Sequence, residues 1–541
     1  MKNRRSVFLR IAVPFLLGVV MASLVHLPVQ PLGWGLVAVV MGLVSLLLFN
    51  SGTSSSCFAC LFAFVGGAFV TTLNREYATG APPADYMKYD AVVMSTPQRH
   101  GKVVGFDALV VDVADRRVSP FMAKVSIAGL DTCRLGIGSG IEALSVFTVH
   151  GQRKDSKIPV QRKAATASER RFDYSRYLQT QGFRAQTFVY ASDMKLKQIS
   201  ATSIPVWHRL RLDLLSFPPR PKQKHLLAFR QRLIAQFRRG DVSGGNLAVI
   251  SALTLGDKRM IDRHVRTVYS VSGASHVLAL SGLHIAIIYT LLMLLLDGRR
   301  LFRLRIAARL LAIATVWWYV MIVGLPVSAV RSALMLSVCS VVAVANRESL
   351  SLDHLALAAF VVVAVSPMSV FDVGFQMSFI AVASILLFVP QMERLLFRSP
   401  IWQRQPMRWV SGMVTVSLAA QLGVSPLTAY YFGRFSCYFL LTNFIAIPMA
   451  MLLLYGALAM FLLSWQPVVS GLLAYGLGSA AQLLNDALAL IAGLPMASIE
   501  NIAISPWQVV AVYGVVVLVW LGMRMIGGYG VMRPFRMGNE P

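Results

Sequence analysis

Residues 277–296 read VLALSGLHIAIIYTLLMLLL and contain no charged side chain. A helix of about 20 apolar residues is long enough to cross the roughly 30 Å hydrocarbon core of a bilayer. Similar apolar runs occur on both sides of this stretch, so the sequence predicts about 11–12 transmembrane helices, one or two of which could be re-entrant. The predicted spans are Val7–Leu27, Leu32–Phe49, Cys57–Leu73, Val277–Leu296, Ile306–Val323, Val327–Ala345, Leu355–Val365, Val373–Val389, Val410–Val424, Tyr438–Leu463, Val469–Ala492 and Trp507–Gly522.

The composition of the whole chain supports this interpretation. Of its 541 residues, 56% are hydrophobic and 14% are charged, whereas a soluble domain is typically about a quarter charged. The first apolar run follows MKNRR, as in a signal peptide, but two more apolar runs come directly after it. We therefore interpret it as a retained helix. The predicted fold class is a polytopic α-helical membrane protein.

Short basic segments predict how the chain crosses the membrane, because cytoplasmic loops are enriched in Lys and Arg. Four clusters, Lys2–Arg10, Arg299–Arg305, Arg394–Arg408 and Arg524–Arg536, are each expected in the cytoplasm. Both termini are then cytoplasmic, and residues 74–240 lie outside the cell (inner) membrane.

That outer segment is large enough to be a domain and is strongly basic. Residues 74–240 contain 28 Lys and Arg against 13 Asp and Glu, a net charge of +15. Five runs alternate apolar and polar residues with the period of a β-strand, which predicts a small antiparallel barrel or sandwich. These runs are DAVVMS, KVVGFDALVVDV, FMAKVSIA, ALSVFTVHG and FRAQTFVYA. The predicted domains are three N-terminal transmembrane helices (1–73), an all-β domain (74–200), amphipathic helices (201–240) and the remaining membrane domain (241–541).

Basic and aromatic residues are interleaved between the fourth and fifth predicted strands. Cations beside aromatic rings suit single-stranded nucleic acid, whose phosphates are charged and whose bases stack. A solvated loop or a contact with anionic lipid headgroups are the alternatives. The candidate DNA-binding residues are Arg153, Lys154, Lys157, Arg162, Lys163, Arg170, Arg171, Phe172, Tyr174, Arg176 and Tyr177.

Residues 205–239 combine basic residues with apolar residues at helical spacing. Leu226, Phe229, Leu233 and Phe237 recur on one face, with arginines between them. Such a helix is expected to lie in the membrane interface or to pack on the membrane domain, and the two interpretations are compatible.

Polar side chains inside apolar spans are costly, so they normally face a cavity or another helix. After a turn at Gly273, the expected helix carries His276, Ser281 and His284, and the two histidines would share a broad face. A zinc site would need a third ligand such as Asp257 or His264, and the sequence has no H-E-x-x-H pattern. Hydrogen bonding between helices is the alternative.

Further polar residues lie near Gly-Pro and Ser-Pro breaks at Gly324–Pro326, Ser366–Pro367 and Ser425–Pro426. Broken helices at membrane depth are tolerated where they line a watery path or are buried in protein. Arg331 is the most costly of these residues, and either a passing phosphate or a fixed ion pair could compensate it. The candidate pathway-lining residues are His276, Ser281, His284, Arg331, Asp372, Gln376, Gln421 and Asn443.

Six stretches resemble, in order, the signatures of the ComEC family, which forms the inner-membrane DNA channel of natural transformation. Five lie in the membrane domain: LTLGDKRMID, GASHVLALSGLHIAI, PVSAVRSALM, SPMSVFDVGFQMSFIAV and SLAAQLGVSPLTAYYFGRFSCYFLLTNFIAIP. The sixth, RRFDYSRYLQTQGFRA, is similar to the segment that closes the family's extracytoplasmic OB-like domain.

The resemblance implies a channel for single-stranded DNA and not an enzyme. Membrane lipids and DNA-receptor proteins outside the membrane would be further partners, and no cofactor is expected. Many family members continue into a metallo-β-lactamase-like nuclease domain, but none of the nine histidines here forms its H-x-H-x-D-H motif, and there is no P-loop. A separate nuclease and a cytoplasmic ATP-driven helicase or translocase are therefore expected. The alternatives are a transporter of a smaller anionic or lipid substrate and an intramembrane metallohydrolase.

Overall fold

A computed structural model of the chain describes most of the predicted all-β domain and most of the predicted membrane helices. The described residues are 7–24, 31–47, 53–76, 86–95, 97–100, 103–113, 116–129, 135, 138–149, 178, 183–199, 232–238, 242–258, 260–296, 305–346, 351–397 and 399–526.

Three helices open the chain and match the first three predicted spans: α1 (Val7–Leu24), α2 (Pro31–Leu47) and α3 (Thr53–Glu76). α1 crosses α3 at very close range, because side chains at Gly18 and Gly67 would collide with the backbone carbonyls of Phe64 and Phe15. Small residues allow helix backbones to approach in this way inside membranes.

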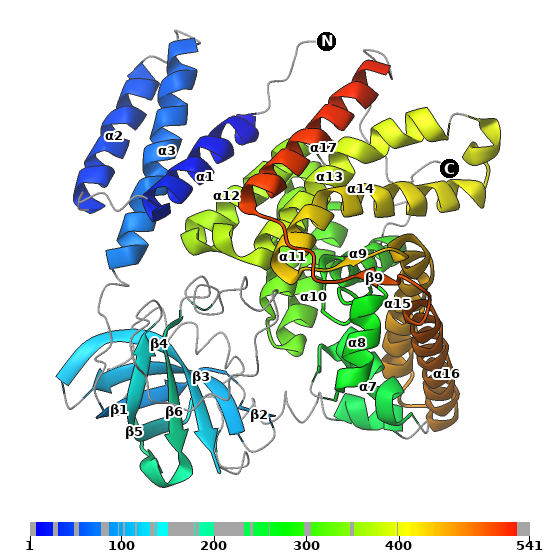
Figure 1. Cartoon of the computed structure of the whole chain (residues 1–541), viewed down its shortest axis with the longest axis horizontal. Coiled ribbons are helices and arrows are strands. Elements are labelled where there is room, and N and C mark those ends of the chain that lie inside the picture. The colour runs from blue at the N-terminus through cyan, green and yellow to red at the C-terminus, as the bar shows by residue number, and fades with distance from the viewer. Residues whose placement is uncertain are drawn as a thin grey trace.

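A seven-stranded sheet follows, drawn at the lower left of Figure 1. Its strands are β1 (Tyr86–Val93), β2 (Gln98–His100), β3 (Val103–Val113), β4 (Arg116–Ala128), β5 (Gly140–Val149), β6 (Phe183–Tyr190) and β7 (Met194–Leu196). The five alternating runs of the sequence correspond to β1, β3, β4, β5 and β6. β2 and β7 have three residues each, which is too short for a recognisable period.

The strands close into a barrel. Its order is β1-β3-β4-β6-β5, and β5 pairs back with β1. β4 and β6 run parallel, and the other neighbours in this ring are antiparallel. This is the order of an OB-type barrel, with β1, β3, β4, β5 and β6 as its strands one to five. The prediction of a small OB-like domain is confirmed.

Inward-facing side chains fill the barrel because each strand places alternate residues on its inner face. Tyr89, Phe106, Phe121, Ile127 and Phe147 are among the buried residues of this core. Burial of these large side chains supplies the main driving force for folding of the barrel.

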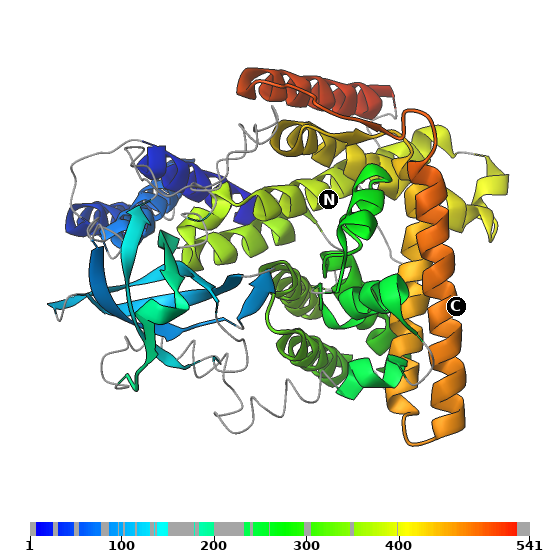
Figure 2. The ribbon, with the colours of Figure 1, turned by 60° about the horizontal axis from the view of Figure 1, so that its bottom comes forward.

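The C-terminal half is helical and lies beside the barrel, with β2 on the side nearest to it in Figures 1 and 2. Its main helices are α7 (Gly244–Leu255), α8 (Arg263–Val271), α9 (Gly282–Leu296), α10 (Arg305–Val323), α11 (Val327–Asn346), α12 (Leu352–Val365), α13 (Val373–Leu396), α14 (Met407–Phe432), α15 (Phe439–Leu462), α16 (Pro467–Ala492) and α17 (Pro506–Ile526).

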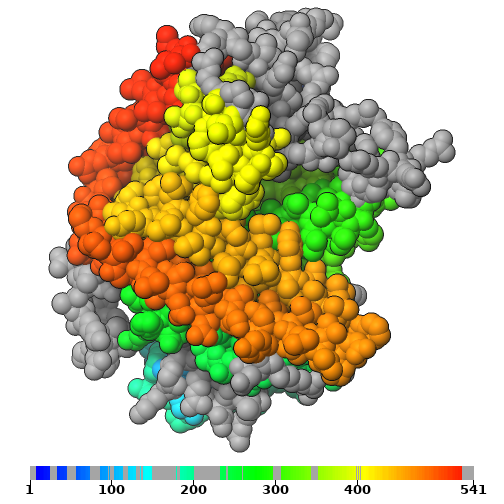
Figure 3. All heavy atoms as spheres, turned by 90° about the vertical axis from the view of Figure 1, so that its right-hand side faces the viewer, coloured from blue at the N-terminus to red at the C-terminus, as the bar shows by residue number. Residues whose placement is uncertain are grey.

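Six described helices are long and apolar enough to cross a membrane: α10, α13, α14, α15, α16 and α17. The other predicted spans also form apolar helices, with shorter apolar stretches, and α7 is a further short apolar helix that the sequence did not predict. Large apolar residues such as Leu472, Leu490, Trp507 and Leu518 are exposed on α16 and α17, and Figure 3 shows α15 and α16 running across an open face. The chain is a multi-pass membrane protein, and 11–12 crossings remain a prediction.

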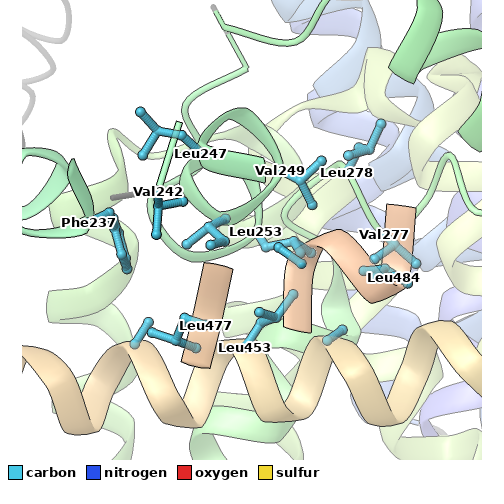
Figure 4. Close-up of a cluster of buried hydrophobic side chains, with 14 of the residues drawn as sticks. Phe237, Val242, Leu247, Val249, Leu253, Val277, Leu278, Leu453, Leu477 and Leu484 are labelled. Atoms are coloured by element: carbon cyan, nitrogen blue, oxygen red, sulfur yellow. The ribbon is translucent and has the colours of Figure 1, made fainter. Parts of the chain in front are cut away.

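The largest buried cluster joins the amphipathic segment to the membrane domain (Figure 4). Residues 232–238 are helical, and Leu233, Ile234 and Phe237 are buried with residues of α7, α15 and α16. The ring centroid of Phe237 lies 5.4 Å from that of Phe461. This part of the predicted amphipathic helix therefore packs on the membrane domain, whereas Leu226 and Phe229 lie outside the described residues.

Two sequence predictions about helix ends are wrong. α9 begins at Gly282, so Val277–Ser281 are not helical and His276 does not share a helix face with His284. Ser425–Pro426 does not break α14, which continues to Phe432 with Pro426 buried inside it. In the turn before Pro426, the Tyr513 hydroxyl of α17 donates to the Gly423 carbonyl at 2.8 Å and links α17 to this part of α14.

Candidate functional site

Residues 272–281 form an irregular loop between α8 and α9, inside the helical domain. Its first carbonyl, that of Ser272, accepts hydrogen bonds from the Ser436 hydroxyl at 2.9 Å and the Thr442 hydroxyl at 2.8 Å. The Ser328 hydroxyl of α11 donates to the carbonyl of Leu280 at 2.6 Å. Side chains from other elements therefore hold both ends of the loop, which satisfies backbone groups that a helix would otherwise pair.

Gly273 is required at the start of this loop. Its φ of +90° is unfavourable for any residue with a Cβ, and an added Cβ would lie 2.8 Å from the Ser436 hydroxyl oxygen. The tight turn places the Nδ1 atom of His276 3.1 Å from the Gly273 carbonyl, so that nitrogen is the donor. The His276 side chain is exposed, and its Nε2 atom remains available to accept a hydrogen bond.

His284 lies on the first turn of α9 and is fully buried. Its Nδ1 atom accepts from the backbone N–H of Ser281 at 3.3 Å, which caps the helix. In the neutral ring the proton is then on Nε2, and this atom has no hydrogen-bond partner among the described residues. His276 and His284 belong to different elements, the 272–281 loop and α9.

Arg331 lies on α11 and forms a buried ion pair with Asp372. Each side chain is only 9% exposed. Asp372 also caps α13, because its carboxylate accepts from the backbone N–H of Phe375 at 3.2 Å. Gly374 leaves room for the guanidinium, since an added Cβ would lie 2.5 Å from an Arg331 nitrogen. Of the two sequence hypotheses for Arg331, this geometry supports the fixed ion pair.

The remaining candidate residues lie on three neighbouring helices. The side-chain amide of Gln376 donates to the Val370 carbonyl at 2.9 Å and accepts from the Tyr431 hydroxyl at 2.8 Å, which links α13 to α14. Gln421 on α14 and Asn443 on α15 are partly buried and take part in none of these hydrogen bonds. The structure thus forms two polar groups, one around the 272–281 loop and one around Arg331 and Asp372.

Sequence reasoning missed the hydroxyl groups that hold the loop. Ser328, Ser436 and Thr442 all lie in stretches that resemble the family signatures. Small hydroxyl side chains are common in membrane helices and often bond to their own helix backbone, so nothing in their spacing distinguished them. Among the described residues, no three His, Cys, Asp or Glu side chains come together in a way that could hold a metal ion.

A recess of about 670 Å³ opens where residues 232–238 meet α7 and α8. It is lined by Arg238, by Ser243–Gly245 at the N-terminus of α7, and by Asp262. One oxygen of the Asp262 carboxylate accepts from the backbone N–H of Val265 at 2.7 Å and caps α8.

The barrel carries the other candidate site. The predicted DNA-binding residues between Arg153 and Tyr177 connect β5 to β6, which are strands four and five of the barrel, and they lie outside the described residues. Near the start of β5, the Lys197 ammonium binds Asp90 at 2.8 Å and Glu142 at 3.1 Å and ties the segment after β7 to the barrel. Hydrogen bonds from Lys88 and then Lys197 lower the pKa of Glu142.

Comparison with known proteins identifies the membrane domain. The Competence protein family matches residues 253–525, from the end of α7 to α17. Because this is half of the chain, the protein belongs to the Competence protein family. It is 31% identical over 231 residues to ComE operon protein 3 of Bacillus subtilis (strain 168). The match covers 43% of this chain and 26% of that relative, about a quarter of its length. No solved structure matches the chain.

Proposed function

We propose that this protein acts in DNA-uptake competence as the inner-membrane passage for single-stranded DNA. The observation that carries the proposal is the closed OB-type barrel, whose fourth and fifth strands are joined by a connection with eight Lys and Arg residues between Arg153 and Arg176. OB barrels hold single strands without reading sequence. Family membership and the name of the Bacillus relative give independent support.

The charge of the outer segment suits the first step, capture of the polymer. Each nucleotide carries a phosphate, and a net charge of +15 over residues 74–240 attracts it before any specific contact forms. The candidate DNA-binding residues would replace the counterions of the strand and draw it towards the membrane.

The second step is passage through the helical domain. The 272–281 loop is the best-suited element, because its irregular backbone is held at both ends while the His276 side chain remains exposed. Irregular backbone in a membrane domain is tolerated where it lines a watery path or is buried in protein, and the exposed His276 favours the first setting. Arg331 takes no direct part in this proposal, since Asp372 already neutralises it.

The passage depends on other proteins for power and for strand degradation. We expect a receptor outside the membrane, a nuclease that removes one strand, and a cytoplasmic ATP-driven helicase or translocase. The family is consistent with a channel, and we propose no catalytic step for this chain.

Uptake of labelled DNA by cells that lack the gene tests the proposal. DNA held by the receptor outside the membrane should persist at the surface, while the label protected from added nuclease should fall to background and return on complementation. A complementing variant in which His276 is changed to Ala should restore the protein level but only part of the protected label. Normal protected label in the deletion strain would refute the proposed function. A deletion strain that binds less DNA at its surface but imports the bound DNA normally would refute it as well.

A further inference from the structure

The outer surface of the barrel has two apolar faces. The first is formed by β1, β3 and β4, where the outward-pointing side chains of Val92, Leu109 and Val111 are buried. Ile199, from the segment after β7, packs against this cluster together with Met122. OB barrels usually bind oligonucleotides on strands two and three, which are β3 and β4 here. In this protein the chain's own residues occupy a large part of that face.

The second face is formed by the outward residues of β5 and β6 and the start of β1, and it is open. Leu144, Val146 and Phe188 are 38%, 37% and 39% exposed, and Tyr86 and Tyr190 are 59% and 61% exposed. Tyr86 is the register partner of Val146 across the β1–β5 pair. The rings of Phe188 and Tyr190 lie with centroids 5.5 Å apart and planes at 85°. We call these five residues the aromatic face.

A rigid backbone supports the two rings of β6. This strand pairs with β4 on one side and with β5 on the other. Its inward residues Ala185, Thr187 and Val189 are buried in the barrel. Phe188 and Tyr190 point outward and are not part of the barrel core. Rings held on a paired strand lose little conformational freedom when a ligand stacks on them.

Charge complementarity indicates what binds the aromatic face. Lys88 lies opposite Leu144 in the β1–β5 register and binds Glu142 at 3.1 Å, but its side chain is 48% exposed. Lys195 is exposed on β7, and both lie within an outer segment of net charge +15. Aromatic rings flanked by cations fit a ligand with flat apolar groups and negative charges. Single-stranded nucleic acid has both, because its bases stack on rings while its phosphates attract Lys.

We propose that the aromatic face, and not the β3–β4 face, is the stacking platform for the bases of single-stranded DNA. The inference rests on the proposed function and adds the surface and the mode of contact. Stacking on Phe188 and Tyr190 accepts any base, as uptake of DNA of any sequence requires.

Binding by the full-length protein in detergent micelles tests the platform. The probes are a fluorescent oligothymidylate of about 20 nucleotides and an abasic strand of the same length, which keeps the phosphates but has no bases. Wild type should prefer the strand with bases. Changing both Phe188 and Tyr190 to Ala should weaken its binding by about tenfold or more, since each stacked base contributes at least about a fivefold factor. Abasic binding and the salt dependence should stay unchanged.

Two controls separate stacking from unfolding and from loss of apolar area. The substitutions Phe188→Tyr and Tyr190→Phe keep the rings and should retain binding. Leu196→Ala removes a side chain that is 57% exposed on β7 and lies outside the aromatic face, so it should have no effect. Resistance of the barrel to proteolysis, measured for every variant, should match wild type.

The outcomes distinguish the two proposals. Absence of salt-dependent binding by wild type would refute the proposed capture function itself. Wild-type binding that the double alanine variant retains in full would refute the platform alone, as would an equal loss for the abasic strand. Unchanged oligonucleotide binding with lost binding to vesicles of anionic phospholipid would assign the face to the membrane surface and overturn the inference.

Discussion

The guanidinium of Arg331 on α11 is paired with the carboxylate of Asp372, which at the same time caps the first turn of α13. One carboxylate thus neutralises a buried cation and satisfies a helix N-terminus, and it links α11 to α13. The pair explains how a costly arginine is accommodated in an apolar domain, and it favours a structural role for Arg331.

The first prediction concerns this pair. Arg331→Gln leaves a buried carboxylate uncompensated and should lower the free energy of unfolding by about 3–5 kcal/mol, with a fall in the amount of protein in the membrane. Asp372→Asn keeps an oxygen that can accept from the Phe375 N–H, and it removes the charge that Arg331→Gln leaves unpaired. The double variant should therefore lose less stability than the sum of the losses of the two single variants. Arg309→Gln on α10 is the control, since Arg309 has no part in the pair. Thermal stability and membrane abundance provide the measurements. Normal abundance of Arg331→Gln with blocked DNA import would instead favour the phosphate hypothesis.

A second prediction tests the 272–281 loop. Gly273→Ala introduces a Cβ at positive φ and against Ser436, so it should lower stability by about 1–3 kcal/mol and reduce DNA import. Gly412→Ala on α14 meets open space at helical φ and should be neutral or slightly stabilising. Transformation frequency divided by membrane protein level separates the two effects. Equal stability and equal transformation frequency of the two variants would show that the turn does not need glycine.

A third prediction concerns electrostatic capture of DNA by arginines that the sequence analysis identified. Replacing Arg170, Arg171 and Arg176 with Gln should weaken single-stranded DNA binding at low salt. The slope of the logarithm of affinity against the logarithm of salt should become shallower by about 2, at roughly 0.7 per phosphate contact. Removing three arginines of the predicted cytoplasmic cluster (299, 300 and 303) should leave the slope unchanged. An unaltered slope in the first variant would exclude these residues as phosphate contacts.

The predicted topology gives a fourth test. Cys133 lies in the outer segment by sequence, so a membrane-impermeant thiol reagent should label it in intact cells when it is the sole cysteine. The reagent should reach the cysteine without opening the cytoplasm, after a brief denaturing step if burial protects it. Labelling that appears only once the inner membrane is permeabilised would contradict the placement of residues 74–240 outside.

Residues 197–199 give a fifth prediction. Lys197 anchors this segment to Asp90 and Glu142, and Ile199 covers the β3–β4 face. Because the folded pKa of Glu142 is lowered, its contribution to stability is present above the unfolded pKa of about 4.3 and is lost as pH falls through the folded value. Acid below about pH 4 should therefore loosen the segment, and Lys197→Met should make its amide hydrogens exchange faster even at pH 7. Unchanged exchange in that variant would show that the lysine does not hold the segment.

The sequence by itself determined the class of protein and the strands of the barrel. Runs of about 20 apolar residues have no stable place in water, and alternation along β1, β3, β4, β5 and β6 identifies one inner and one outer face, because both patterns follow from local geometry. Residues near in sequence were sufficient for these predictions. The family resemblance, on which the proposed function partly rests, also comes from contiguous stretches.

Only the tertiary structure decided which polar residues meet. Arg331 and Asp372 are 41 positions apart, and Ser272 is 170 positions from Thr442, so no local period could pair them. The sequence placed His276 and His284 on one helix, but the hydroxyl groups of Ser328 and Thr442 made a loop the better solution by satisfying its carbonyls. The same holds for the barrel surface, where Ile199 covers one apolar face and leaves Phe188 and Tyr190 open. Hydrophobic patterning is encoded along the chain, whereas the partner of a buried polar group depends on which helices and strands pack together.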